Sequence, residues 1–155
     1  MMWFEDITIG SKANLGTHTF TQDEIIAFGK KYDPQPFHVD PLAAKRSSYG
    51  GIIASGWHTV AIWMRLMIDF QKSLGGSGMR GGVSPGFEDL RWIKPVRPGM
   101  TLTYSTETIE KVDLKSRPEL GLIKSRNEAR DENGALYMSF IGKGFVFRKP
   151  DGATP

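Results

Sequence analysis

The longest apolar stretch of the chain runs from Trp57 to Leu74 and reads WHTVAIWMRLMIDFQKSL. Its apolar side chains point in nearly every direction around a helix, and its charged residues are Arg65, Asp69 and Lys72. A helix that is apolar on most sides is buried on most sides. The charges lie too near its middle for a membrane span, which needs about 20 apolar residues. The pattern therefore predicts one central helix covered by the rest of the domain.

Apolar and polar residues alternate in the second half of the chain, for example in Met100–Ser105 and Leu136–Phe140. This period of two is typical of strands with one buried face. Pro98-Gly99 and Asn133-Gly134 are turn signals between such strands. We therefore predict about five antiparallel strands, over residues 14–20, 87–96, 100–112, 121–130 and 135–148.

Two short helices are predicted before the central one. Thr21 and Glu24 form a capping box, which predicts a helix over residues 22–31. Pro34 and Pro36 should end it in an extended or turning segment, and Asp40-Pro41 should begin a second helix. The predicted fold class is α+β, with an antiparallel sheet wrapped around one long central helix. The chain, residues 1–155, fits one domain with a frayed tail at 149–155.

Composition limits the possible functions. Apolar residues make up 39% of the chain and charged residues 24%, which suits a folded domain. The formal charge of +3 is too small to indicate nucleic-acid binding, although it mildly favours an anionic small molecule. The absence of cysteine excludes disulfides, thiol nucleophiles and cysteine-bound zinc. With no signal-peptide pattern at the N-terminus, we expect a cytoplasmic protein without membrane contact.

The segment from Tyr32 to Asp40 carries the most distinctive chemistry. It places Asp33 five positions before His38, with two prolines that stiffen the chain between them. A rigid segment that presents a carboxylate and an imidazole together can hold one water between a base and an acid. The alternative is that Asp33 is a turn residue and His38 a structural histidine.

Gly56 is predicted at or just before the first turn of the central helix. Free backbone N–H groups and the helix dipole favour negative charge there, as an oxyanion hole requires. The alternative is that this glycine only permits tight packing. The glycine-rich segment 75–82 lacks the Gly-Lys-Ser/Thr ending of a phosphate-binding loop and is expected to be a flexible connection.

These motifs, taken in order, resemble the MaoC-like dehydratases, which include the (R)-specific enoyl-CoA hydratases. The resemblance is carried by Asp33-x-x-x-x-His38-x-Asp40, by Gly51–Gly56 leading into a long apolar helix, and by Lys94–Met100. It covers about residues 13–148. Each part alone is weak, but the combination in this order is specific.

The resemblance implies a hot-dog fold and the hydration of a trans-2-enoyl thioester to an (R)-3-hydroxyacyl thioester. Asp33 and His38 would be the catalytic dyad, and the Gly56 N–H would bind the thioester oxygen. His38 would take a proton from water, and Asp33 would pass a proton to C2. The substrate would be an acyl-CoA or acyl-carrier-protein thioester, with no cofactor. Because open sheet edges commonly pair with a second copy, we expect a homodimer.

Other residues near these motifs are weaker candidates. Gln35, Ser55 and His58 are expected to contact substrate, although His58 could instead be structural. Gln35 replaces an asparagine of many family members, and Met64 falls near a serine of some hydratases. His18 is expected to be solvated. The spacing of the three histidines matches no metal motif, so no metal site is predicted.

Two alternative functions remain. The first is a hot-dog thioesterase, which would place a carboxylate on the central helix. The only acid in that helix is Asp69, far from the N-terminus of the helix, which weakens this alternative. The second alternative is an acyl-CoA-binding module without catalytic activity, which the departures at Gln35 and Met64 favour. If Asp33 and His38 converge, the structure favours the enzyme; if they point apart, it favours the binding module.

Overall fold

A five-stranded antiparallel sheet forms the body of the computed structural model, which describes residues 2–75, 78 and 81–150. The strands are β1 (Lys12–Thr19), β2 (Gly86–Trp92), β3 (Thr101–Asp113), β4 (Leu120–Arg130) and β5 (Leu136–Phe147). They lie in the order β1-β3-β4-β5-β2, and all neighbours are antiparallel. The predicted sheet is therefore confirmed. β2 ends at Trp92, before its predicted limit at Val96, and the Val96 carbonyl accepts instead from the Ala54 N–H.

The helices are η1 (Phe4–Asp6, a 3-10 turn), α1 (Gln22–Tyr32), α2 (Pro36–Val39), α3 (Pro41–Arg46) and α4 (Gly56–Ser73). The capping of α1 is confirmed, because the Thr21 side chain accepts a hydrogen bond from the Glu24 N–H. The segment after Pro34 differs from the prediction, since α2 forms one helical turn there. Pro36 is the first residue of α2, a position at which the missing N–H costs no hydrogen bond.

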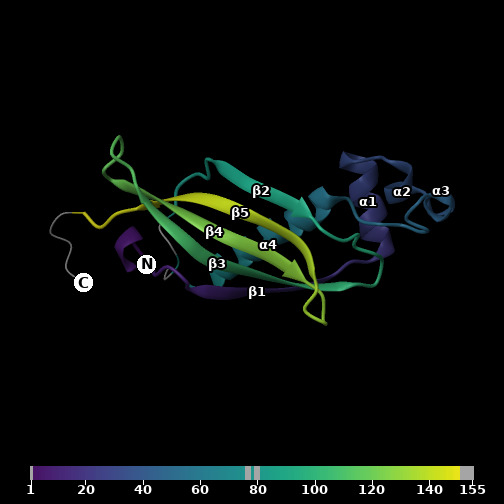
Figure 1. Ribbon diagram of the computed structural model, residues 1–155, viewed down its shortest axis with the longest axis horizontal. Helices are drawn as coiled ribbons and strands as arrows, with labels where there is room; N and C mark the ends of the chain where they lie inside the picture. The colour runs from purple at the N-terminus through teal and green to yellow at the C-terminus, as the bar shows by residue number, and fades with distance from the viewer. Residues whose placement is uncertain (1, 76–77, 79–80, 151–155) are drawn as a thin grey trace.

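The sheet lies against one side of α4, and α1, α2 and α3 gather at one end of the sheet (Figure 1). This is the α+β hot-dog arrangement expected from the sequence. The prediction that α4 is buried on most sides is wrong for the single chain. Trp57, Met64 and Ile68 are 50%, 50% and 43% exposed, because the sheet covers only one face of the helix.

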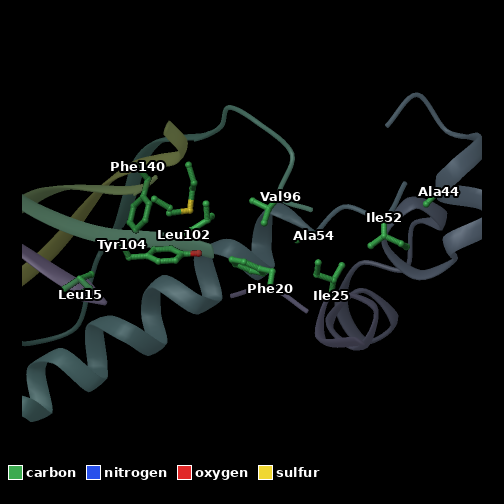
Figure 2. Packing of buried hydrophobic residues seen from close by; sticks show 12 residues of the cluster. Leu15, Phe20, Ile25, Ala44, Ile52, Ala54, Val96, Leu102, Tyr104 and Phe140 are labelled. Carbon is green, nitrogen blue, oxygen red and sulfur yellow. The ribbon is translucent and has the colours of Figure 1, made fainter. Parts of the chain in front are cut away.

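A continuous hydrophobic core joins the sheet to the three N-terminal helices. Figure 2 shows it running from Tyr104 and Leu102 on β3, through Phe20, to Ile25 on α1 and on to Ala44 on α3. Tyr104 is fully buried, and its hydroxyl donates a hydrogen bond to the Thr59 carbonyl in the first turns of α4. The core therefore fixes the start of α4 relative to both the sheet and α1.

The N-terminal turn η1 and the segment after β5 lie together at the opposite end of the sheet (Figure 1). Lys149, predicted as part of a frayed tail, is held in place. Its N–H donates to Glu5 and its ammonium group pairs with Asp6 at 2.8 Å. Residues 151–155 of the predicted tail and residues 76–77 and 79–80 of the predicted flexible segment lie outside the described residues. Within the described part of the chain, no helix is long and apolar enough to cross a membrane.

Candidate active site

A cavity of about 540 Å³ lies where the end of α1, the one-turn α2 and the start of α4 meet. Five of the six residues singled out in the sequence line it: Asp33, Gln35, His38, Ser55 and Gly56. The sixth, His58, is not among the lining residues and packs elsewhere. The opposite wall includes Trp92, Lys94 and Tyr137. Lys94 belongs to the Lys94–Met100 motif, whereas sequence reasoning missed Trp92 and Tyr137 as cavity residues because neither belongs to a motif.

His38 is buried in this cavity, with one ring nitrogen held by the backbone. Its Nδ1 lies 2.7 Å from the Ile53 carbonyl oxygen. Because a carbonyl only accepts hydrogen bonds, Nδ1 carries the proton of the neutral ring, and Nε2 carries the lone pair. That Nε2 lies 3.3 Å from Asp33 Oδ2. The arrangement orients His38 as a base whose free nitrogen faces the carboxylate.

Asp33 caps the C-terminal end of α1 and accepts two side-chain hydrogen bonds. Gln35 Nε2 donates to Oδ1 at 2.8 Å, and Ser55 Oγ donates to Oδ2 at 2.7 Å. Burial raises the pKa of Asp33, but these two hydrogen bonds and the neighbouring His38 outweigh burial and lower the pKa below its ordinary 3.8. Asp33 is therefore a carboxylate near neutral pH, suited to accept a hydrogen bond from water.

Ser55 stands at the N-cap of α4 but does not cap it, because its hydroxyl is engaged by Asp33. As a result, the Gly56 and Trp57 N–H groups have no hydrogen-bond partner within the described residues. Free amides at the start of an 18-residue helix favour a negatively charged atom. They lie beside the Asp33–His38 pair, as an oxyanion site would require.

Gly56 is needed for a steric reason as well. A Cβ atom at this position would lie 2.3 Å from Cε2 of the Trp92 indole. Trp92 therefore packs directly against the first residue of α4. The geometry is compatible with both a packing role and an oxyanion role for this glycine. The Trp92 ring, which lines the cavity, lies against the same residue that carries the free N–H group.

The bond from Ser55 to Asp33 predicts a pH-dependent change in stability. Ser55→Ala should raise the pKa of Asp33 and lower the free energy of unfolding by about 1–3 kcal/mol near neutral pH. A carboxylate with a lowered folded-state pKa stabilises above its unfolded pKa, and this contribution disappears as pH falls through the folded pKa. Urea unfolding should therefore separate the variant from wild type at neutral pH, and the difference should shrink as pH falls through the folded-state pKa of Asp33, which lies below 3.8.

Ser73→Ala, at the other end of α4, is the matched control. The Ser73 hydroxyl donates only to the Phe70 carbonyl, so its loss should cause a small change with no such pH dependence. Equal stability of wild type and Ser55→Ala at neutral pH would show that the Ser55 hydrogen bond does not stabilise the Asp33 carboxylate.

Other groups considered in the sequence lie away from this cavity. Asp69, the acid of the central helix, pairs with Arg65 at 2.7 Å and is not a lining residue. Among the described residues, no group of three or more His, Cys, Asp or Glu side chains is placed to hold a metal ion.

A second cavity, of about 520 Å³, lies along α4 beyond the first. Its walls are largely apolar side chains of α4, β2 and β5, including Val60, Trp63, Leu90 and Phe140. Trp63 is fixed by Phe140, against which it packs edge to face at 4.7 Å, and by a hydrogen bond from its Nε1 to Asn127. A largely apolar cavity therefore lies further along the same helix whose first turn faces the Asp33–His38 pair.

The comparison with known proteins agrees with this fold. Residues 6–128 match the MaoC-like domain family. The chain is 32% identical over 122 residues to the uncharacterized protein YdeM of Bacillus subtilis. The match covers 79% of this chain and 82% of YdeM.

Solved structures of similar proteins share the fold of this chain. The MaoC-like dehydratase from Rhodospirillum rubrum is 34% identical, with a TM-score of 0.81 over 97% of this chain and 99% of the other. The (R)-hydratase from A. caviae, involved in PHA biosynthesis, shares the fold at 23% identity, with a TM-score of 0.63 over 94% of this chain and 99% of the other.

The fold is that of a hot-dog protein. The chain belongs to the MaoC-like domain family.

Proposed function

We propose that this protein is a hydro-lyase that reversibly adds water to trans-2-enoyl thioesters and forms (R)-3-hydroxyacyl thioesters. The observation that carries the proposal is the convergence of Asp33 and His38 at 3.3 Å in one cavity, beside the free Gly56 amide. An oriented base, an ionised carboxylate and an oxyanion donor together meet the needs of proton transfer next to a thioester.

In the hydration direction, a water held by His38 Nε2 and Asp33 attacks C3 of the enoyl group. His38 takes one proton from that water as the new C–O bond forms. The electrons of the double bond move toward the thioester oxygen, where the Gly56 N–H stabilises the enolate. The proton held by His38 then passes, through Asp33, to C2. Because Asp33 is ionised at rest, it relays this proton and is not the resting acid.

The acyl chain would extend from the Asp33–His38 pair along α4 into the apolar cavity. That cavity lies further along the same helix, and its lining of Val60, Trp63 and Leu90 suits a hydrocarbon chain. The thioester carrier, coenzyme A or an acyl carrier protein, would remain at the mouth.

Two observations favour this function over its alternatives. An inactive binding module would not need Asp33 and His38 to converge, nor His38 to be oriented by the Ile53 carbonyl. A thioesterase with its acid on the central helix would need Asp69 in the cavity, but Asp69 pairs with Arg65 outside it.

The function is tested with short trans-2-enoyl-CoA substrates, by following loss of the conjugated thioester absorbance and release of free thiol together. Wild type should consume the conjugated absorbance without thiol release, and Asp33→Ala and His38→Ala should not. Thiol release by wild type would favour the thioesterase. No reaction across a panel of chain lengths would reject both enzymes.

We also propose that the working form is a homodimer. Large apolar side chains of α4 and β2 are exposed, including Met64, Ile68, Phe87 and Trp92, and β2 is an edge strand. Exposed apolar surface beside an open edge is typical of an interface. Sedimentation should give twice the chain mass of 17.3 kDa, and Ile68→Asp should give the monomer. A wild-type monomer at micromolar concentration would contradict this proposal.

A further inference from the structure

His58 is a buried histidine that the proposed reaction does not use. It is 5% exposed and lies in the first turn of α4, next to the cavity but not in its wall. Its ring stacks on Phe28 of α1, with centroids 4.6 Å apart and planes 7° apart, and meets Phe20 edge to face at 5.1 Å. Its Nδ1 has no hydrogen-bond partner within the described residues. The ring is therefore held by stacking and not by hydrogen bonds from Nδ1.

The other ring nitrogen of His58 faces the start of α1. Nε2 lies 3.6 Å from Glu24 Oε1, and the same oxygen lies 2.5 Å from Nε2 of His18 on β1. The expectation that His18 is solvated is therefore wrong, because Glu24 reaches back to it. Glu24 and Phe28 thus contact the His58 ring from α1, and His18 on β1 fixes the Glu24 carboxylate that faces this ring.

Burial lowers the pKa of His58; Glu24 opposes this effect, and His18 adds to it. The ring is accordingly neutral near neutral pH. Its titratable neighbours are Glu24 on α1 and His18 on β1. A neutral ring is compatible with close stacking on Phe28 and with an Nδ1 that has no partner.

These contacts connect the start of α4, which carries Ser55 and Gly56, with α1, which ends at Asp33. Ser55 and Gly56 belong to the same end of α4 as His58, and the Ser55 carbonyl accepts the His58 N–H at 3.0 Å. Asp33 caps the C-terminal end of α1, the helix on which His58 is stacked. The hydrogen bond from Ser55 to Asp33 therefore joins the start of α4 to the end of α1, the same two helices that the His58–Phe28 stack joins.

We propose that His58 is a positioning residue: by packing on Phe28 and facing Glu24, it sets the start of α4 against α1, so that Ser55 reaches Asp33. This inference rests on the proposed function for its effect on catalysis, although its effect on Asp33 is independent of any substrate. His58 itself touches neither substrate nor water in this account.

The test compares His58→Ala with His58→Phe, which keeps the stacked ring but removes both nitrogens. The midpoint of Asp33 ionisation is followed by carboxyl NMR titration, and kcat and KM by the hydratase assay. His58→Ala should raise the Asp33 midpoint, in the same direction as Ser55→Ala, and lower kcat roughly 10- to 100-fold with little change in KM. His58→Phe should fall between His58→Ala and wild type, because it restores the stack on Phe28.

A control variant separates positioning from general loss of stability. Ile7→Ala truncates a buried side chain in the distant cluster with Phe4, Ile123 and Val146. It should lower thermal stability and leave the Asp33 midpoint unchanged.

The inference is overturned if folded His58→Ala keeps the wild-type midpoint and kcat, if His58→Phe is as impaired as His58→Ala, or if Ile7→Ala shifts the midpoint equally. If wild type proves inactive but His58→Ala still shifts the midpoint, the positioning role stands and only the proposed function fails.

Discussion

His38→Asn should lower kcat by about 10²- to 10⁴-fold while the protein stays folded. The asparagine amide can keep the donor that His38 Nδ1 supplies to the Ile53 carbonyl, but no atom replaces Nε2 beside Asp33. The variant therefore removes the base and spares the local hydrogen bond. Steady-state kinetics on an enoyl-CoA, with thermal unfolding as the check on folding, measure both effects.

Asp33→Asn extends this prediction. It keeps the shape of the side chain and removes the charge that Gln35 and Ser55 stabilise. If Asp33 and His38 act on one water, they serve the same step of the reaction. The kcat of the variant that carries both Asp33→Asn and His38→Asn should therefore be close to the lower kcat of the two single variants. A kcat of His38→Asn within tenfold of wild type, or fully additive losses, would contradict the dyad.

Gly56→Ala should both destabilise the protein and impair catalysis. The added Cβ would lie 2.3 Å from the Trp92 ring, so the indole or the first turn of α4 must move. Overpacking of this kind costs about 1–3 kcal/mol. Because the same turn supplies the Gly56 amide and Ser55, its displacement should also lower kcat, which urea unfolding and kinetics can measure on the same sample.

Gly121→Ala provides a matched control for the steric effect. A Cβ at Gly121 would lie 2.2 Å from the Phe4 ring, in the cluster at the far end of the sheet. This variant should lose stability to a similar extent but keep kcat. If Gly56→Ala has normal stability and normal activity, then neither the contact with Trp92 nor the placement of the amide matters.

Much of the fold could be predicted from local patterns. Alternation in Met100–Ser105 and the turn at Asn133-Gly134 indicated strands, because strand faces repeat every two residues. The Thr21 cap and the apolar run after Gly56 indicated helices for equally local reasons. Burial of α4 was overestimated, because an apolar side chain such as Ile68 can be covered by a second copy as well as by its own chain.

The candidate site could be predicted only in part. Asp33, His38 and Gly56 stand in a recognisable order along the chain, and the structure brings them to one cavity. The roles of Ser55 and His58 depend on contacts between distant segments. Ser55 would ordinarily cap α4, and nothing in the sequence indicates that its hydroxyl turns to Asp33 instead. Likewise, no spacing predicts that His58 stacks on Phe28.

Isotope labelling tests whether Asp33 and His38 activate water for addition to an enoyl thioester. The protein is incubated with a short trans-2-enoyl-CoA in water labelled with heavy oxygen, and the products are analysed by mass spectrometry and chiral separation. If this activation occurs, wild type should give an intact (R)-3-hydroxyacyl-CoA with the label on C3, and His38→Asn should give almost none. Label in a released free acid, or unchanged substrate with wild type, would contradict it.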